Sequence, residues 1–243
     1  MTKKIPEVPV EVSDLINQFF DVPIKRDRVG GLHDIERSSL RRSEALVLAS
    51  LVCTLKPQNC IELGFAEGGS CTAISAARRY YKIASRHIVL DPFQETLTKG
   101  AGLLEIERLG LNEAIEWRAE RSETFLHDRW KRGVVNIDFA FVDGGHDMGQ
   151  KVADAFYLNK VVRKGGMIVF HDALLPSTAT AVSYLVRECG YSIIQLPADS
   201  RLQQVSRRVR YFCRLGSWYV SHVVPKLHRS LVATRKSSPA PIS

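Results

Sequence analysis

Four side chains that could do acid–base or metal chemistry stand just after two apolar segments of the chain: Asp143, His146, His171 and Asp172. The apolar segments, 138–142 and 167–170, have the length and composition of buried strands. Because the carboxyl ends of neighbouring parallel strands meet at one edge of a sheet, the four side chains could converge on one cleft. Histidine can remove a proton near neutral pH, and carboxylates can bind a hard divalent cation. The pattern therefore indicates a candidate catalytic or metal site.

Two glycines separate the acid and the histidine of the first pair. Gly144 and Gly145 allow the backbone to turn tightly and leave space for a bound molecule beside it. A divalent metal site is one interpretation of the four residues, and His146 acting as a general base is another. A purely structural alternative stays open, in which Asp143 caps the following helix and the second pair hydrogen-bonds to loop backbone.

The elements that must position these residues alternate between strands and helices along most of the chain. Short apolar runs bounded by turn residues predict strands at 60–63, 87–90, 114–118, 138–142, 167–170 and 191–196. Apolar residues at helical spacing predict helices at 40–55, 70–81, 97–109, 123–130, 150–162 and 177–188. This alternation predicts an α/β fold, with a doubly wound, mostly parallel sheet and helices on both faces. The Lys-Gly-Gly segment 164–166 is expected to turn into the strand that follows it.

Three regions are expected along the 243 residues. Residues 1–37 are mixed in character and predict a helical or irregular N-terminal cap. Residues 38–199 carry the alternating pattern of one α/β domain. Residues 200–243 form a basic C-terminal extension, and its last segment, RKSSPAPIS, is expected to be disordered.

The positive charge of the chain is concentrated in this extension. The formal net charge is +8, but residues 200–243 contain nine Lys or Arg and no Asp or Glu, which leaves residues 1–199 with 25 basic and 26 acidic side chains. The α/β domain is therefore not expected to bind nucleic acid. Residues 200–236 mix basic side chains with aromatic and apolar ones, which favours a final strand or helix packed on the domain with its basic face in solvent. Binding of this segment to an anionic membrane surface, and a nucleic-acid or protein partner for it, stay open as alternatives.

Targeting signals and cysteine usage favour the cytoplasm. No apolar run approaches the roughly 20 residues that a membrane-spanning helix needs. The N-terminus has lysines but no apolar core behind them, so a signal peptide is not expected. The five cysteines form no CxxC pair and are expected to be reduced. The prediction is a cytoplasmic protein, peripheral at the membrane if the extension binds lipid.

A glycine-rich turn follows the first predicted strand, in the segment IELGFAEGGS. Glycine lets the backbone approach a ligand closely, although the spacing is neither GxGxxG nor that of a phosphate-binding P-loop. Glu62 lies inside the strand, where a carboxylate needs a partner, and Asp91 ends the next strand. An acid at that place can accept both hydroxyls of a ribose. An acidic lining of this kind suits a cationic nucleoside and suits a pyrophosphate poorly.

These features form an ordered set: E-x-G-x-x-x-G-x-S, an acid at the end of the second strand, and D-G-x-H after the fourth. The set resembles the class I S-adenosylmethionine-dependent methyltransferases over about residues 40–196. The resemblance implies a Rossmann-like methyltransferase fold and S-adenosylmethionine as the cofactor. It also implies an antiparallel seventh strand, for which 205–213 is a candidate.

The resemblance assigns cofactor-binding roles to eight residues: Glu62, Gly64, Gly68, Gly69, Ser70, Asp91, Ser122 and Asp143. The glycines would lie under the amino-acid end of the cofactor, Asp91 would bind the ribose, and Ser122 would sit by the adenine. Asp143 would meet the methyl end. Residues 120–121 are Glu-Arg, where relatives often have a glycine or another small residue.

The ends of the fourth and fifth strands are most similar to the cation-dependent O-methyltransferases, the catechol and caffeoyl-CoA branch and the related sugar O-methyltransferases. In that branch an Asp after the fourth strand and an acidic pair after the fifth hold Mg²⁺. Asp143 and Asp172 match, and His171 replaces the first acid of the pair. The resemblance thus implies these three residues as ligands of Mg²⁺ or another divalent cation, while an imidazole also suits softer ions or no ion. His146 stands where the sugar-modifying relatives have a histidine general base.

The residues and the resemblance together predict an S-adenosylmethionine-dependent methyltransferase that methylates a hydroxyl on a small molecule or sugar. His146 and Asp143 are the predicted catalytic residues. A hydroxylated small molecule is the predicted partner, and the formation of a homodimer is left open. Two alternatives remain: a catalytically silent protein that keeps the cofactor fold and acts through its basic tail, and a nucleotide-dependent oxidoreductase. The missing GxGxxG argues against the oxidoreductase.

Overall fold

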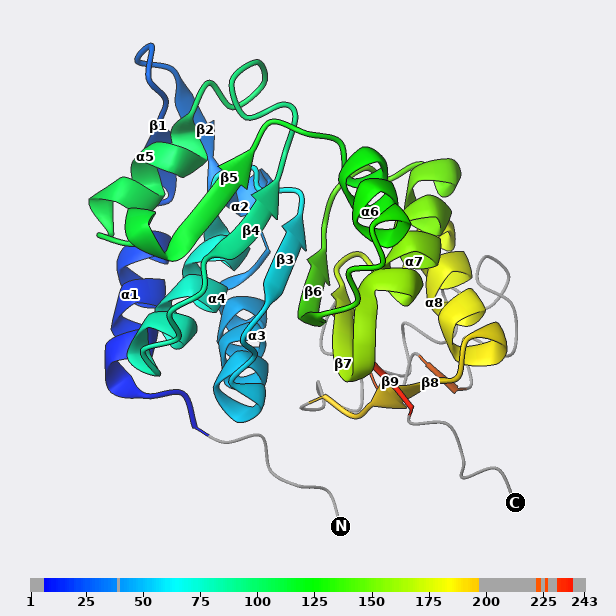
Figure 1. Cartoon of the computed structure of the whole chain (residues 1–243). Coiled ribbons are helices and arrows are strands. Elements are labelled where there is room, and N and C mark those ends of the chain that lie inside the picture. Colours follow the sequence, from blue (N-terminus) through cyan, green and yellow to red (C-terminus); the bar gives the residue numbers. More distant parts are fainter. Residues whose placement is uncertain (1–6, 39, 197–221, 224–225, 227–230, 238–243) are drawn as a thin grey trace. The chain divides into compact units, whose positions relative to one another are not determined.

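The computed structural model describes residues 7–38, 40–196, 222–223, 226 and 231–237. Within them the chain forms two compact units, which meet in sequence between Ser122 and Glu123. Each unit contains strands covered by helices, as Figure 1 shows.

The first unit has a parallel three-stranded run in the order β5-β4-β3. Its strands are β3 (Cys60–Leu63), β4 (His87–Leu90) and β5 (Ile115–Arg118). Its longer helices are α1 (Val10–Phe20), α3 (Arg42–Leu55), α4 (Gly69–Tyr80) and α5 (Ala101–Arg108), and a 3₁₀ turn η1 spans Asn112–Ala114. All four residues of β3 are buried, as expected for a strand with both faces covered. Helices α1, α3 and α4 pack against one another.

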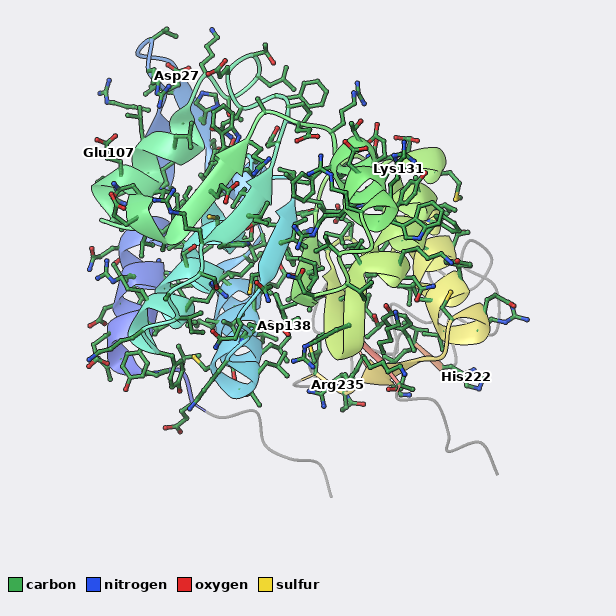
Figure 2. All side chains as sticks on the ribbon, viewed as in Figure 1. Asp27, Glu107, Lys131, Asp138, His222 and Arg235 are labelled. Carbon is green, nitrogen blue, oxygen red and sulfur yellow. The ribbon has the colours of Figure 1, made fainter. Side chains whose placement is uncertain are left out.

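The N-terminal cap contains a small hairpin that the sequence patterns did not predict. It pairs β1 (Ile24–Arg26) with β2 (Leu32–Asp34) in antiparallel register and leads into α2 (Ile35–Ser38). Strands of three residues are too short to show a period of two, which is why the pattern was missed. At the bend, Asp27 (labelled in Figure 2) accepts hydrogen bonds from the backbone N–H groups of Val29 and Gly31, at 2.9 and 2.6 Å. Such a side-chain link is a common way to fix a tight turn.

The second unit has strands in the order β6-β7-β9-β8. The strands are β6 (Ile137–Val142), β7 (Val162–Phe170), β8 (Tyr191–Ile194) and β9 (Val232–Lys236). The helices are α6 (Ser122–Lys131), α7 (Met148–Val161) and α8 (Pro176–Glu188), and α7 packs on α8. β6 and β7 are parallel, whereas β9 is antiparallel to both of its neighbours. The predicted α/β class, doubly wound and mostly parallel, is confirmed.

Strand β7 begins earlier than predicted. The expected turn at 164–166 is wrong, because these residues lie inside the strand. Gly165 has a positive φ of 78°, and a Cβ on Gly166 would lie 2.6 Å from Val162 Cγ1 and 3.1 Å from the Ile137 carbonyl oxygen. The glycines therefore allow an irregular strand to continue next to β6, whose register shifts at this point.

The antiparallel strand is not where the sequence suggested. It is β9, at Val232–Lys236, while the candidate 205–213 lies outside the described residues. The expected disorder is wrong for Arg235, which pairs with both β7 and β8, and for Lys236, which pairs with β8. Basic residues at the end of β9 masked its strand character. Lys236 Nζ donates to the carbonyl oxygens of Asn159 and Val162, at 2.6 and 3.0 Å, where α7 ends.

Within the described part of the chain, each helix is too short or too polar to cross a lipid bilayer. Four cysteines are free, as predicted: Cys53, Cys60, Cys71 and Cys189. The prediction for Cys213 falls outside the described residues.

Candidate active site

The glycine-rich turn after β3 adopts the backbone conformation that the sequence implied. Gly64 and Gly68 both have φ of 92°, a region that side chains other than glycine rarely occupy. Gly68 is the N-cap of α4, so Gly69 and Ser70 form the first turn of that helix. The turn therefore presents backbone N–H groups at the start of a helix, an arrangement that can hold a polar ligand.

Glu62 and Ser70 are brought together, as predicted for residues of one site. Glu62 is fully buried in β3, and the Ser70 hydroxyl donates a hydrogen bond to Glu62 Oε1. His87 Nε2 lies 3.5 Å from the other oxygen, Oε2. Burial lowers the pKa of His87 well below its usual value, with a smaller effect from the charge of Arg78, so the imidazole is neutral here. The contact with Ser70 ties the start of α4 to β3.

Asp91, the predicted ribose ligand, holds the glycine-rich turn in place. Its Oδ2 accepts from the backbone N–H groups of Phe65 and Ala66, at 3.0 and 3.1 Å, and its Oδ1 accepts from Phe93 at 2.8 Å. A carboxylate oxygen can accept more than one hydrogen bond, so Oδ1 keeps capacity for a ligand hydroxyl. The ribose role stays a prediction, and the structure adds a second role for Asp91 as the anchor of the turn.

Two further residues support this turn and were not singled out from the sequence. Gln94 donates from Nε2 to the Ala66 carbonyl oxygen at 2.8 Å and accepts at Oε1 from the backbone N–H of Gly102 at 3.1 Å. Gly102 lies in α5 so close to the turn that a Cβ would come within 2.4 Å of the Ala66 oxygen. The only signal in the sequence was an unexplained glycine in a helix, which usually has a packing reason. Ser122, the predicted adenine contact, is buried at the first residue of α6.

In the second unit, the side chains that follow β6 and β7 form one cluster. His171 Nδ1 lies 3.2 Å from Asp143 Oδ1 and 3.4 Å from Asp172 Oδ1. His146 Nδ1 lies 3.4 Å from the other oxygen of Asp172, Oδ2. The backbone pairing of β6 and β7 continues to the first residue after β7, because the N–H of His171 donates to the Val142 carbonyl oxygen at 3.1 Å. The predicted convergence of these four residues is therefore observed.

The capping alternative for Asp143 is wrong. The N-cap of α7 is Asp147, whose Oδ1 accepts from the backbone N–H of Gln150 at 2.9 Å. Asp143 instead faces His171. Its position at the end of β6 thus serves the cluster rather than the helix.

The carboxyl group of Asp172 is held ionised by its neighbours. Burial would raise its pKa, but a hydrogen bond with His171 and the electrostatic effects of His171, His146 and Lys151 outweigh burial, and the pKa is lowered below its usual value. Asp172 also has a positive φ of 51°, which a residue other than glycine adopts only at some cost. Backbone strain of this kind is common where a side chain must point in a set direction.

Three of the four residues could hold a metal ion. One ligand atom each from Asp143, His171 and Asp172 lie within 4.8 Å of one another, and all three side chains are partly exposed. Two carboxylates and an imidazole form a donor set that suits a divalent transition ion at least as well as Mg²⁺. The residues therefore fit the cation that the resemblance implies. A second group with suitable atoms, Glu62, Cys71 and His87, is fully buried and links β3, α4 and β4.

Lys151 is the residue of this region that the sequence reasoning missed. It lies in the first turn of α7 and is fully buried, as is Asp154, one turn further along the helix. Its burial follows from the packing of α7. Buried residues in α7 recur at helical spacing, and Lys151 occupies the first place in that series, followed by Asp154, Ala155, Leu158 and Val161.

Comparison with known proteins supports this view of the fold. The family described as "Methyltransferase domain" matches residues 61–173, which run from the glycine-rich turn to the residues just after His171–Asp172. No curated protein matches the chain.

Several solved structures share the fold. An O-methyltransferase from Bacillus cereus, in complex with SAH, is 17% identical, with a TM-score of 0.55, covering 78% of this chain and 84% of that one. The O-methyltransferase TomG from Streptomyces achromogenes, involved in tomaymycin synthesis and in complex with SAM, is 12% identical, with a TM-score of 0.58 and coverage of 98% and 92%. A putative O-methyltransferase from Klebsiella pneumoniae is 9% identical, with a TM-score of 0.62 and coverage of 95% and 91%.

The family match spans both the glycine-rich turn and the strand-end cluster, and the solved structures share the fold. Residues 61–173 therefore carry a methyltransferase domain, and the chain has the Rossmann-like methyltransferase fold.

Proposed function

We propose that the enzyme transfers the methyl group of S-adenosylmethionine to a hydroxyl oxygen of a small-molecule acceptor, with His146 as the general base. The observation that carries this proposal is the pairing of an exposed imidazole with a partly exposed acid. His146 is 60% exposed and its Nδ1 lies 3.4 Å from Asp172, which is only 31% exposed. Such a pair leaves the other ring nitrogen, Nε2, available to an acceptor. The solved O-methyltransferases that share the fold support oxygen as the acceptor atom.

The residues around the glycine-rich turn would bind the cofactor. The N–H groups of the turn and the first turn of α4 would contact its amino-acid end, next to the linked pair Glu62 and Ser70. The free lone pairs of Asp91 Oδ1 would accept from the ribose, and Ser122 would contact the adenine. Asp143, with its carboxylate at the end of β6, would face the methyl end.

The proposed reaction is a direct displacement at the methyl carbon. The acceptor O–H gives its proton to Nε2 of His146, while the oxygen forms a bond to the methyl carbon and the carbon–sulfur bond breaks. The bonding pair stays on sulfur, which loses its positive charge, and the products are the methyl ether and S-adenosylhomocysteine. Asp172 holds the imidazole in orientation and stabilises it once it is protonated. Much of the rate enhancement would come from positioning of the oxygen in line with the methyl group.

Asp143, His171 and Asp172 would hold a divalent cation, Mg²⁺ or another, if the enzyme follows the cation-dependent branch. When bound, such an ion would orient the acceptor oxygen and lower the pKa of its hydroxyl. The three ligand atoms are already within 4.8 Å of one another. His146 would keep the same role, because it contacts Asp172 through Oδ2 while His171 lies near Oδ1.

Three further predictions concern partners and location. Binding of residues 200–236 to an anionic membrane remains a prediction, because most of that segment lies outside the described residues. The homodimer and the cytoplasmic location are also predictions. The acceptor is proposed as a hydroxylated small molecule such as a phenol or a sugar.

Substitution of His146 by alanine tests the proposal. Turnover should fall roughly 100-fold or more, because loss of a general base typically costs that much. The affinity for S-adenosylmethionine, measured by calorimetry, should stay the same, because the proposed cofactor contacts do not include His146. The assay measures release of S-adenosylhomocysteine with a panel of catechols, other phenols and sugars.

A matched control is His127→Ala, which removes an exposed histidine of α6 that contacts Trp130 and Tyr157. It should leave turnover unchanged. If His146→Ala retains wild-type turnover with every acceptor that the wild-type enzyme methylates, His146 is not the base.

A further inference from the structure

The β1–β2 hairpin of the N-terminal cap holds an acid and a histidine in contact. Asp27 Oδ2 lies 3.1 Å from His33 Nε2, and the side chain of Asp27 is only 2% exposed. The other oxygen, Oδ1, accepts from the backbone N–H groups of Val29 and Gly31. The bend of the hairpin therefore fixes the carboxylate, and the carboxylate orients the imidazole.

The second ring nitrogen of His33 faces the glycine-rich turn. Nδ1 lies 3.9 Å from Oε1 of Glu67, the residue that precedes the N-cap of α4. The side chain of Glu67 is only 5% exposed, and its Oε2 has no hydrogen-bond partner among the residues that the structure describes. A buried carboxylate is costly unless a donor or a cation compensates it. The imidazole of His33 is placed to give that compensation.

The hairpin is itself anchored, so it can support the turn. The backbone N–H of Arg28 donates to the Lys99 carbonyl oxygen at 3.0 Å, just before α5. Lys25 of β1 donates to Glu105 of α5 at 2.9 Å. The hairpin therefore rests on the helix that also packs against the glycine-rich turn. Its contact with Glu67 is thus made from a fixed element.

We propose that His33 is a positioning residue for the cofactor, which links Asp27 of the hairpin to Glu67 and thereby holds the glycine-rich turn in its binding conformation. A protonated imidazole has one N–H for each acid and so can join them. The proposal rests on the proposed function, in which the turn contacts the amino-acid end of S-adenosylmethionine. It gives a task in cofactor binding to the N-terminal cap, which precedes the segment that the methyltransferase family matches.

Binding of S-adenosylhomocysteine to the full-length chain, measured by calorimetry, tests the proposal without an acceptor. His33→Ala and Glu67→Gln should each weaken binding roughly tenfold, because each breaks the link. The double variant should bind no more weakly than the weaker of the two single variants, since two changes that break one link do not add. Losses that add would mean that the two residues act separately, and would overturn the proposal.

Substitution of Gly31 breaks the link without changing His33 or Glu67. A Cβ on Gly31 would lie 2.3 Å from Asp27 Oδ2, the oxygen that faces His33, so the carboxylate must move. Gly31→Ala should therefore weaken S-adenosylhomocysteine binding about as much as His33→Ala.

Gly30→Ala is the matched control at the same bend. Gly30 has a positive φ of 87° and open space around a Cβ, so its substitution adds backbone strain without the clash. It should keep the wild-type affinity for S-adenosylhomocysteine. Equal losses of affinity in Gly30→Ala and Gly31→Ala would overturn the proposal, because general strain in the hairpin would then explain both.

Folding and turnover are read separately. Circular dichroism shows whether each variant is folded, and Gly31→Ala and Glu67→Gln decide the matter if His33→Ala is not. With an acceptor that the wild-type enzyme methylates, His33→Ala should raise the KM for S-adenosylmethionine and leave kcat unchanged, whereas a misfolded fraction would lower kcat.

Failure of this role and failure of the proposed function give different results. Wild-type affinity for S-adenosylhomocysteine in His33→Ala overturns the role of His33, and so does a wild-type chain that does not bind S-adenosylhomocysteine. Full turnover in His146→Ala contradicts the proposed function and leaves the binding results unaffected.

Discussion

His146 and His171 share one carboxylate and use it differently. His171, only 13% exposed, bridges Asp143 and Asp172, whereas His146, 60% exposed, meets only the outer oxygen of Asp172. A largely covered imidazole between two acids fixes them relative to each other. An exposed imidazole with one acid behind it can exchange protons with a ligand and with solvent. The two histidines therefore fit different tasks, one structural and one chemical, although both follow the ends of strands.

The first unit contains a buried ion pair. Lys25 Nζ donates to Glu105 Oε2 at 2.9 Å and to the Phe19 carbonyl oxygen at 2.5 Å, and Arg108 Nη2 donates to the same Glu105 oxygen at 2.8 Å. Burial would raise the pKa of Glu105, but the hydrogen bonds from Arg108 and Lys25 outweigh burial and lower it below 4.5. The contacts link the hairpin, α1 and α5.

Glu105→Gln should make the enzyme less stable at neutral pH by about 3 kcal/mol, because a buried lysine loses its charged partner. Since the pKa of Glu105 is lower in the folded state, its contribution to stability is complete above the unfolded value of 4.5 and is lost as the pH falls through the folded value. The difference in unfolding free energy between wild type and variant should therefore shrink below about pH 4.

Urea denaturation between pH 7 and pH 3 measures that difference. Glu107→Gln is the control, because Glu107 is exposed on α5 (labelled in Figure 2). Its stability curve should run parallel to that of the wild type. A gap between wild type and Glu105→Gln that stays constant with pH would show that the carboxylate charge is not what stabilises this contact.

At the scale of elements, α5 packs against the glycine-rich turn and supports its conformation. Gly102 brings the backbone of α5 against the turn, and Gln94 bonds to both. The turn is held from a second side by Asp91 at the end of β4. Its conformation therefore depends on α5, which has no proposed contact with the cofactor, and on Asp91, which is also the proposed ribose ligand.

Gly102→Ala should weaken S-adenosylmethionine binding roughly tenfold or more. The added methyl group would lie 2.4 Å from the backbone oxygen of Ala66, so the turn must move. Overpacking of this kind also costs about 1–3 kcal/mol of stability. Calorimetry gives the affinity, and thermal unfolding gives the stability.

Gly133→Ala is the comparison variant. Gly133 has a positive φ of 71° but open space around a Cβ, so its substitution adds backbone strain without a clash. It should lose about 1 kcal/mol of stability and retain cofactor affinity. Wild-type affinity in Gly102→Ala would mean that the turn tolerates displacement, and that α5 does not set its shape.

Elements with a clear hydrophobic pattern were predictable from the sequence. Short elements that are held in place by pairing with another strand were not. β3 and β4 were predicted with their observed bounds, because short apolar runs between turn residues show a buried strand directly. β9 and the β1–β2 hairpin were missed, since three to five residues, some of them charged, carry too little pattern. Among site residues, Asp143 and His146 stood out by motif. Lys151 did not, because a lysine in a helix normally faces solvent and only the packing of α7 shows that this one is buried.

At the scale of the whole chain, residues with different proposed tasks fall into different units. The predicted cofactor residues from Glu62 to Ser122 lie in the first unit, and the acid–base cluster lies in the second. The second unit depends on residues near 235, because β9 is the central partner of β7 and β8. Val232, Ala233 and Thr234 are buried, and Thr234 Oγ1 donates to the Ile168 carbonyl oxygen at 3.1 Å.

A chain that stops after residue 230 should therefore fail to unfold cooperatively, because β8 loses its strand partner and β7 loses one of two. A chain that stops after residue 237 retains β9 and should unfold like the full-length protein. Circular dichroism during heating and limited proteolysis distinguish the two truncations. Cooperative unfolding of the shorter chain at the full-length temperature would show that β9 is dispensable.

The position of β9 also has a consequence for biosynthesis. A ribosome makes β7 and β8 well before it makes β9, the last strand that the structure describes. Until then the facing edges of β7 and β8 are unpaired, and such edges readily recruit strands from other chains. A nascent chain would thus be prone to aggregate during translation and would depend on chaperones that cover strand edges. Its sheet can be completed only after residue 236 has left the ribosome.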